Sequence, residues 1–156
     1  MTIEVGDKAL DFELESTDGS VFRLSEAVKD GPVLVNFYVG DFGIRCQDYM
    51  TRFNERIDEL FALGVRIVGV NDNAMDSHKA FKSRMGLKWE LLFDKDRKTA
   101  TAYGCLVGPG HMTTGFTNRE FYLVGKDMKV LFKWRSSVPK ELPEFDMILD
   151  GVQHVL

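Results

Sequence analysis

The chain has 156 residues, of which 44% are hydrophobic and 28% charged, so it can bury a core and is not disordered. Its formal charge of -4 at pH 7 gives no general attraction to nucleic acid or anionic lipid. No apolar run approaches the roughly 18 residues of a membrane span, and residues 1–11 lack the features of a secretory signal. The sequence therefore predicts a cytoplasmic protein with no nucleic-acid or membrane partner.

The first third of the chain predicts a hairpin, a short helix and a buried strand. Residues 12–15 and 21–24 alternate apolar and polar side chains on either side of a polar turn, as a β-hairpin does. Ser25 is expected to cap a short helix that ends near Gly31. The run 32–38 is apolar on both faces, which is typical of a central strand covered on both sides.

A long helical pattern then begins at Cys46 and ends at Gly64. A second strand of the buried type, 65–70, follows directly, so strand, helix and strand form a right-handed unit with parallel strands. Asp76 is expected to cap the next helix, which runs to Gly86. These elements predict α/β architecture.

The rest of the chain predicts a strand, a helix, a second hairpin and a closing helix. Their ranges are 89–93, 98–103, 120–124 paired with 128–134, and 144–152. We find no internal repeat and no linker, which predicts a single domain over residues 1–156.

Cys46 is the most informative position for chemistry. A thiol in the first turn of a helix faces unpaired backbone N–H groups and the positive end of the helix dipole, and Arg45 acts in the same direction. These features favour the thiolate form, which is the nucleophile. On the residues alone, an inert cysteine at the start of the apolar face of the helix is an equally good interpretation.

No metal or cofactor is predicted. The two cysteines, Cys46 and Cys105, are not grouped like zinc ligands, and the three histidines, His78, His111 and His154, are scattered. No second cysteine is separated from Cys46 by two intervening residues, which disfavours disulfide exchange of the thioredoxin kind.

The segment from Asn36 to Met50 resembles the strand, loop and helix of the peroxiredoxin active site, with Phe37 and Tyr38 ahead of the loop and Cys46 in the peroxidatic place. Other segments similar to the family are 6–12, 24–25, 61–70, 77–81, 91–94, 102–104, 119–124 and 132–146. The likeness is nearest to the one-cysteine and bacterioferritin-comigratory branches. It implies a thioredoxin-like fold of the peroxiredoxin type, with a central mixed sheet flanked by helices.

The resemblance also implies a mechanism. The Cys46 thiolate would attack the O–O bond of H2O2 or an organic hydroperoxide and become a sulfenic acid, which a second thiol would reduce. Arg119 matches the arginine that the family places beside the cysteine. Without the motif, a lone arginine before a strand would more often be part of a surface charge pair, and the resemblance reverses that preference. The implied partners are a peroxide, an external reductant that is thioredoxin-like or a small thiol, and a second copy of the chain in a homodimer.

The loop departs from the family pattern of proline, threonine, cysteine and an acidic residue. Val39, Gly43 and Tyr49 occupy the places of the proline, the threonine and the acid. Gly43 lacks the hydroxyl that bonds thiolate and peroxide, and a lost bond of that kind costs about 1.5–3 kcal/mol, or roughly tenfold to a hundredfold in rate. Asp41, Gln47 or the Tyr49 hydroxyl could replace some contacts. We therefore expect a slow thiol peroxidase, and the alternative is a relative that has lost turnover and acts as a thiol sensor or binding module.

Cys105 is the only cysteine in the chain besides Cys46 that could resolve the sulfenic acid as an internal thiol. It follows Ala102 to Gly104, where the family more often has an apolar residue, which favours a buried structural role. Thr51 stands where some bacterioferritin-comigratory relatives carry a resolving cysteine. A one-cysteine scheme with an external reductant follows.

Overall fold

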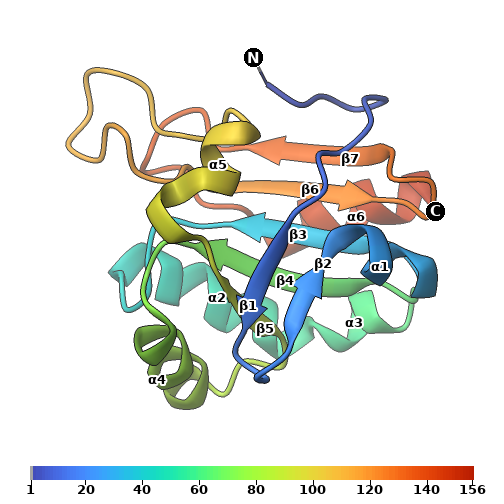
Figure 1. The fold of residues 1–156 in the computed structure, drawn as a ribbon, viewed down its shortest axis with the longest axis horizontal. Coiled ribbons are helices and arrows are strands. Elements are labelled where there is room, and N and C mark those ends of the chain that lie inside the picture. Colours follow the sequence, from blue (N-terminus) through green and yellow to red (C-terminus); the bar gives the residue numbers. More distant parts are fainter. Residues whose placement is uncertain (1) are drawn as a thin grey trace.

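The computed structural model describes residues 2–156 and is built on a seven-stranded sheet (Figure 1). In chain order the strands are β1 (Glu13–Ser16), β2 (Val21–Arg23), β3 (Val33–Phe37), β4 (Arg66–Asn71), β5 (Glu90–Phe93), β6 (Glu120–Val124) and β7 (Val130–Arg135). The helices are α1 (Leu24–Ala27), α2 (Ile44–Arg56), α3 (Asp58–Phe61), α4 (Met75–Met85), α5 (Lys98–Ala102) and α6 (Phe145–Val155), with short 3-10 turns at Val28–Asp30 and Lys95–Arg97. The predicted α/β class is confirmed.

The strand order is β2-β1-β5-β4-β3-β6-β7, so β3 and β4 lie at the centre. β3 pairs in parallel with β4 and antiparallel with β6, which makes the sheet mixed. The parallel pair around α2 is the predicted strand, helix and strand unit, and the hairpins β1–β2 and β6–β7 are also confirmed. All five residues of β3 are buried, as an apolar run of this kind predicts.

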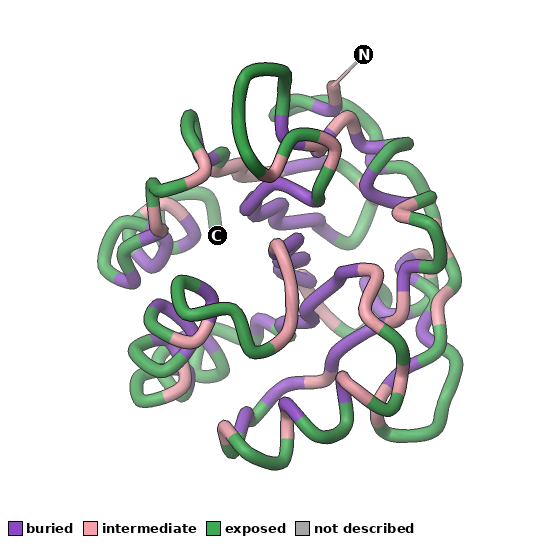
Figure 2. Tube along the Cα trace, turned by 90° about the vertical axis from the view of Figure 1, so that its left-hand side faces the viewer, coloured by how far each residue is buried: buried purple, intermediate pink, exposed green. Residues whose placement is uncertain are grey.

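Side chains on the two faces of the sheet form two separate cores, because successive strand residues point to opposite sides. Leu34 packs into the core under α2 and α6, whereas Val33 and Val35 pack into the core under α1 and α5. In Figure 1, α2 and α6 lie behind the sheet and α5 lies in front of it. Figure 2 shows the buried residues in the middle of the molecule with the exposed turns around them.

Two predicted caps are wrong. Ser25 does not cap α1: the helix begins at Leu24, and the backbone N–H and hydroxyl of Ser25 both donate to the Asp11 carboxylate, at 2.9 and 2.8 Å. Asp76 lies inside the first turn of α4, whose N-cap is Ala74. Both errors arise because a cap depends on which residue leaves the helical conformation first, and residue type alone does not fix that.

The helix that carries Cys46 begins two residues earlier than predicted and is interrupted at Ile57, so the single expected pattern becomes α2 and α3. Gly64 and Gly86 end their helices with positive φ angles of 79° and 63°, as predicted. Over residues 2–156, no helix has both the length and the apolar character needed to cross a membrane.

Candidate active site

Cys46 is the third residue of α2 and lies in its first turn, with only 1% of its surface exposed. The first hydrogen bond of the helix runs from the Gln47 N–H to the Gly43 carbonyl, at 2.9 Å. The N–H groups of residues 44–46 precede that bond and form the positive end of the helix dipole. The thiol is therefore buried and also lies in the first turn of the helix, so its place fits either of the two interpretations that the residues left open.

Arg119 comes immediately before β6 and is 4% exposed, so the interpretation as a surface charge pair is wrong. One of its terminal nitrogens, Nη1, donates to the carbonyl oxygen of Pro139. Its Nε is buried and has no hydrogen-bond partner within residues 2–156. A buried N–H without a partner costs about 1–3 kcal/mol, so this guanidinium has donor capacity that the protein itself does not use.

The Tyr49 hydroxyl is buried and feels the charges of both Cys46 and Arg119. Burial raises the pKa of the Tyr49 hydroxyl well above its ordinary value, the negative charge of Cys46 raises it further, and the positive charge of Arg119 lowers it. The hydroxyl therefore stays protonated, and it donates to Asn36 Oδ1 at 3.0 Å. Asn36 in turn donates to backbone carbonyls of Phe37 and Glu120, so this polar chain spans β3 and β6 under the site.

A cavity of about 560 Å³ opens at Arg119, and neither Cys46 nor Tyr49 is among the residues that line it. Its lining comprises Val39, Arg45, His111, Met112, Thr113, Arg119, Val138, Pro139 and Lys140. It brings Arg119 together with Arg45, the chain neighbour of Cys46. Its lining includes both apolar and cationic side chains, and none of the residues that line it is acidic.

The loop between β3 and α2 is ordered by contacts that do not point at the thiol. Gln47 Nε2 donates to the Phe42 carbonyl at 2.7 Å, and Asp41 accepts from Tyr38 and Ser77. Of the three groups expected to replace the family contacts, Asp41, Gln47 and Tyr49 each make their hydrogen bonds elsewhere. None of the three therefore has a hydrogen bond that points at the thiol within residues 2–156.

Gly43, at the place of the family threonine, is the N-cap of α2, with φ -64° and ψ 136° and no side-chain cap. These angles are open to any residue. A Cβ added there would lie 3.6 Å from the Gly40 carbonyl oxygen, which is ordinary contact. The position therefore has room for a side chain.

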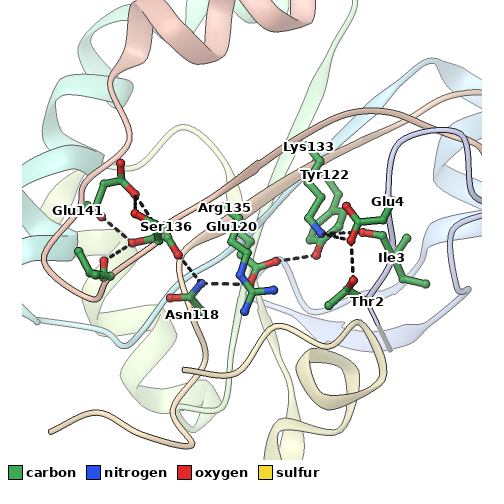
Figure 3. A network of polar contacts seen from close by, with 12 residues as sticks. Thr2, Ile3, Glu4, Asn118, Glu120, Tyr122, Lys133, Arg135, Ser136 and Glu141 are labelled. Atoms are coloured by element: carbon green, nitrogen blue, oxygen red, sulfur yellow. Dashed lines mark hydrogen bonds and ion pairs between the residues drawn. The ribbon is translucent and has the colours of Figure 1, made fainter. Parts of the chain in front are cut away.

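Cys105 belongs to the core on the other face of the sheet from Cys46. Burial raises the pKa of the Cys105 thiol well above its ordinary value, and the negative charge of Glu120 adds to this. Glu120 itself is buried and accepts hydrogen bonds from Tyr122 and Asn118, with Arg135 nearby (Figure 3). A direct disulfide between the two cysteines would require the sheet to open, so the structure favours the structural role of Cys105.

Sequence reasoning missed the burial of Glu120 and the pairing of Asp41 with His78. His78 Nδ1 lies 2.7 Å from Asp41 Oδ2, and both side chains are fully buried. The signal was present in the topology, since both residues follow parallel strands and therefore lie near the same edge of the sheet. Within residues 2–156, no three metal-ligating side chains are grouped closely enough to hold an ion.

Comparison with known proteins gives a consistent result. The profile of the AhpC/TSA family matches residues 5–133. The putative peroxiredoxin bcp of Coxiella burnetii is 32% identical over 107 residues, which cover 69% of this chain and 70% of that protein. Peroxiredoxin Bcp of Bacillus subtilis is 27% identical over 90% of each chain.

Solved structures agree in fold. Peroxidoxin BcpB of Mycobacterium tuberculosis superposes with a TM-score of 0.84 at 24% identity and covers 99% of both chains. A mutant of PrxQ from Xylella fastidiosa gives a TM-score of 0.87 at 18% identity, with 99% of this chain and 98% of that chain covered. The predicted thioredoxin-like fold of the peroxiredoxin type is confirmed.

Proposed function

The chain belongs to the AhpC/TSA family of peroxiredoxins and is a thiol peroxidase that reduces hydroperoxides; from this premise we propose that Cys46 is its nucleophile and Arg119 its electrostatic partner. The observation that carries this proposal is the buried Arg119 Nε, which has no partner within residues 2–156. The charges of Arg119 and Cys46 both act on the Tyr49 hydroxyl, which supports placing the two in one site. A fixed donor without a protein partner is what stabilisation of a developing negative charge requires.

The reaction follows from this placement. The Cys46 thiolate attacks one oxygen of the peroxide, an S–O bond forms and the O–O bond breaks. The leaving oxygen takes up a proton and departs as water or an alcohol, so sulfur is oxidised as the peroxide is reduced. Negative charge moves from sulfur to the leaving oxygen, and Arg119 together with the first-turn N–H groups of α2 can follow it.

The reductant is external in this proposal. Cys105 lies on the far face of the sheet with a raised pKa, so it is neither near Cys46 nor ionised at neutral pH. One external thiol attacks the sulfenic acid and releases water, and a second thiol releases Cys46 from the mixed disulfide. A thioredoxin-like protein or a small thiol would fill this role.

The cavity favours organic hydroperoxides over H2O2. Val39, Met112 and Val138 give it apolar walls, and its size exceeds what H2O2 needs. An apolar body packed on these walls would hold the peroxide group against Arg119. The alternative of a relative without turnover is not favoured, because the buried arginine and the first-turn thiol are both in place.

We also propose a single domain, a cytoplasmic location and a homodimer, which rest on the composition and the family resemblance. Size-exclusion chromatography with light scattering tests the dimer: a mass of two chains supports it, and a mass of one chain contradicts it.

The enzyme assay measures peroxide consumption with dithiothreitol as reductant. Cys46→Ser should abolish turnover, and Arg119→Met should lower the oxidation rate of Cys46 by about 10²–10³, the usual effect of losing one preorganised donor. Cys105→Ala serves as the matched control and should retain activity. Turnover that survives Cys46→Ser, or that disappears in Cys105→Ala while the variant is folded, would refute the proposed roles.

A further inference from the structure

Asp41, in the loop that leads to α2, carries a fully buried carboxylate that the proposed reaction does not use. Its Oδ1 accepts from the Tyr38 hydroxyl at 2.6 Å, and its Oδ2 accepts from the Ser77 hydroxyl at 2.8 Å. His78 Nδ1 lies 2.7 Å from Oδ2, and the Asp41 N–H donates to Asn73 Oδ1 at 2.7 Å. These partners belong to the end of β3 and to the start of α4, so one residue joins the loop to both.

The contacts of His78 hold its ring between the loop and β5. Its Nε2 faces the Leu92 carbonyl oxygen at 3.0 Å, and a carbonyl can only accept, so Nε2 carries a hydrogen. Its Nδ1 faces a carboxylate oxygen, and a hydrogen must lie between them for the contact at 2.7 Å to be attractive. The pair thus links the loop to β5 through His78 as well as to α4.

The loop needs such an anchor. Phe42 has a φ of 61°, in the left-handed region that non-glycine residues avoid. Its ring centroid lies 5.1 Å from that of Phe81, and its carbonyl oxygen accepts a hydrogen bond from Gln47. Val39 supplies no proline ring, and Gly43 supplies no cap. A conformation of this kind persists only where its surroundings determine it.

We propose that Asp41 and His78 are positioning residues, and that their buried pair fixes the 39–43 loop and through it the first turn of α2 that presents Cys46. The inference rests on the proposed function, because it gives the pair a role in peroxide reduction. The pair takes the place of the stiffening that the loop lacks at Val39 and Gly43. A displacement of about 1 Å can cost on the order of a hundredfold in rate, so the anchor has a measurable effect.

The test compares Asp41→Ala with Asp41→Asn. Alanine leaves Tyr38, Ser77 and His78 without their common acceptor. Asparagine keeps the tether, since its oxygen accepts from Tyr38 and its Nδ2 donates to neutral His78, whose Nε2 hydrogen still bonds to Leu92. We expect Asp41→Ala to slow oxidation of Cys46 by H2O2 by about tenfold to a hundredfold and Asp41→Asn to restore most of the rate.

Two further readouts do not depend on peroxide. Amide hydrogen exchange of residues 40–46 should speed up in Asp41→Ala beyond the change in global stability, and it should stay near wild type in Asp41→Asn. The pH profile of Cys46 alkylation by iodoacetamide should move toward higher pH in Asp41→Ala only. The charged and titratable groups around Cys46 and Asp41 are Arg45, Arg119, Tyr38, Tyr49 and His78, and all of them are retained in both variants.

Tyr103→Phe is the control for loss of stability, because it removes a buried hydrogen bond to the Leu10 carbonyl on the opposite face of the sheet. It should leave the Cys46 rate unchanged. If Asp41→Ala does not fold, Ser77→Ala removes one donor from the same carboxylate and should give a smaller slowing of the same sign.

Each outcome decides the proposal. A wild-type rate in folded Asp41→Ala, or in Ser77→Ala where alanine at 41 prevents folding, overturns it. Equal slowing in Asp41→Ala and Asp41→Asn also overturns it, because charge rather than tethering would then matter. If wild-type Cys46 reacts no faster than free cysteine, the proposed function fails, and the exchange and alkylation data still decide whether the pair holds the loop.

Discussion

Restoring a threonine at position 43 should make the enzyme faster. Gly43 has ordinary backbone angles, and an added Cβ would lie 3.6 Å from the Gly40 carbonyl oxygen, so the Cβ of Gly43→Thr fits without displacing the loop. As the N-cap of α2, its oxygen can accept the N–H of Arg45 or Cys46, and its hydrogen remains free for the thiolate or the peroxide.

The expected gain follows from the bond that this hydroxyl would make. A hydrogen bond to a charged group contributes about 1.5–3 kcal/mol, and each 1.36 kcal/mol of barrier is a factor of ten, so the rate should rise about tenfold to a hundredfold. Exchanging glycine for threonine as an N-cap changes helix stability by only a few tenths of a kcal/mol. The rate should therefore change while the free energy of unfolding hardly does.

Stopped-flow tryptophan fluorescence at several H2O2 concentrations gives the second-order rate constant for Cys46 oxidation. Gly43→Ala is the matched control, because it adds the Cβ and restricts the backbone without adding a hydroxyl. We expect Gly43→Thr to exceed both the wild type and Gly43→Ala. An equal rate in all three proteins would refute the reasoning, and an equal gain in both variants would assign the effect to loop stiffening.

Three further predictions concern stability. Tyr49→Phe leaves Asn36 Oδ1 without its donor and should lower the free energy of unfolding by about 1–3 kcal/mol, measured by urea denaturation. Gly151→Ala should lower the free energy of unfolding by about 1–3 kcal/mol, although alanine favours helices. The added Cβ would lie 2.7 Å from Cζ of Phe132 and overlap its ring, and a gain in stability would contradict this packing. Because the pKa of Cys105 is raised in the folded protein, its contribution to stability is present at low pH and is lost as pH rises above about 9. Above that pH, the free energy of unfolding of the wild type should fall by up to about 1.4 kcal/mol per pH unit more than that of Cys105→Ala. Urea denaturation at pH 8 to 10 measures this, and parallel profiles of the two proteins would contradict it.

The fold could be predicted from the sequence because its elements have strong and different periodicities. The apolar run of β3 and the glycines that end α3 and α4 are local signals, and they were sufficient. The cap at Ser25 was wrong because its acceptor is Asp11, which is 14 residues away in the chain. A local sequence pattern does not indicate contacts between residues that far apart in the chain.

The site was partly predictable for the same reason. The place of Cys46 in the first turn of a helix is a local property, and the structure has it. The burial of Arg119 depends on the Pro139 carbonyl, and the Asp41 pair depends on α4 reaching the loop. The predicted parallel strands already place residues 41 and 78 near one edge of the sheet, but the contacts themselves depend on tertiary packing, which the sequence pattern does not give.

The most direct test of the account is the rate constant for oxidation of Cys46 by H2O2, compared with that of free cysteine under the same conditions. We predict a rate at least about a hundredfold above that of free cysteine, which is the effect of one preorganised donor, and the loss of this gain in Arg119→Met. A rate equal to that of free cysteine, unchanged by Arg119→Met, would contradict the claim that this pocket activates the thiol.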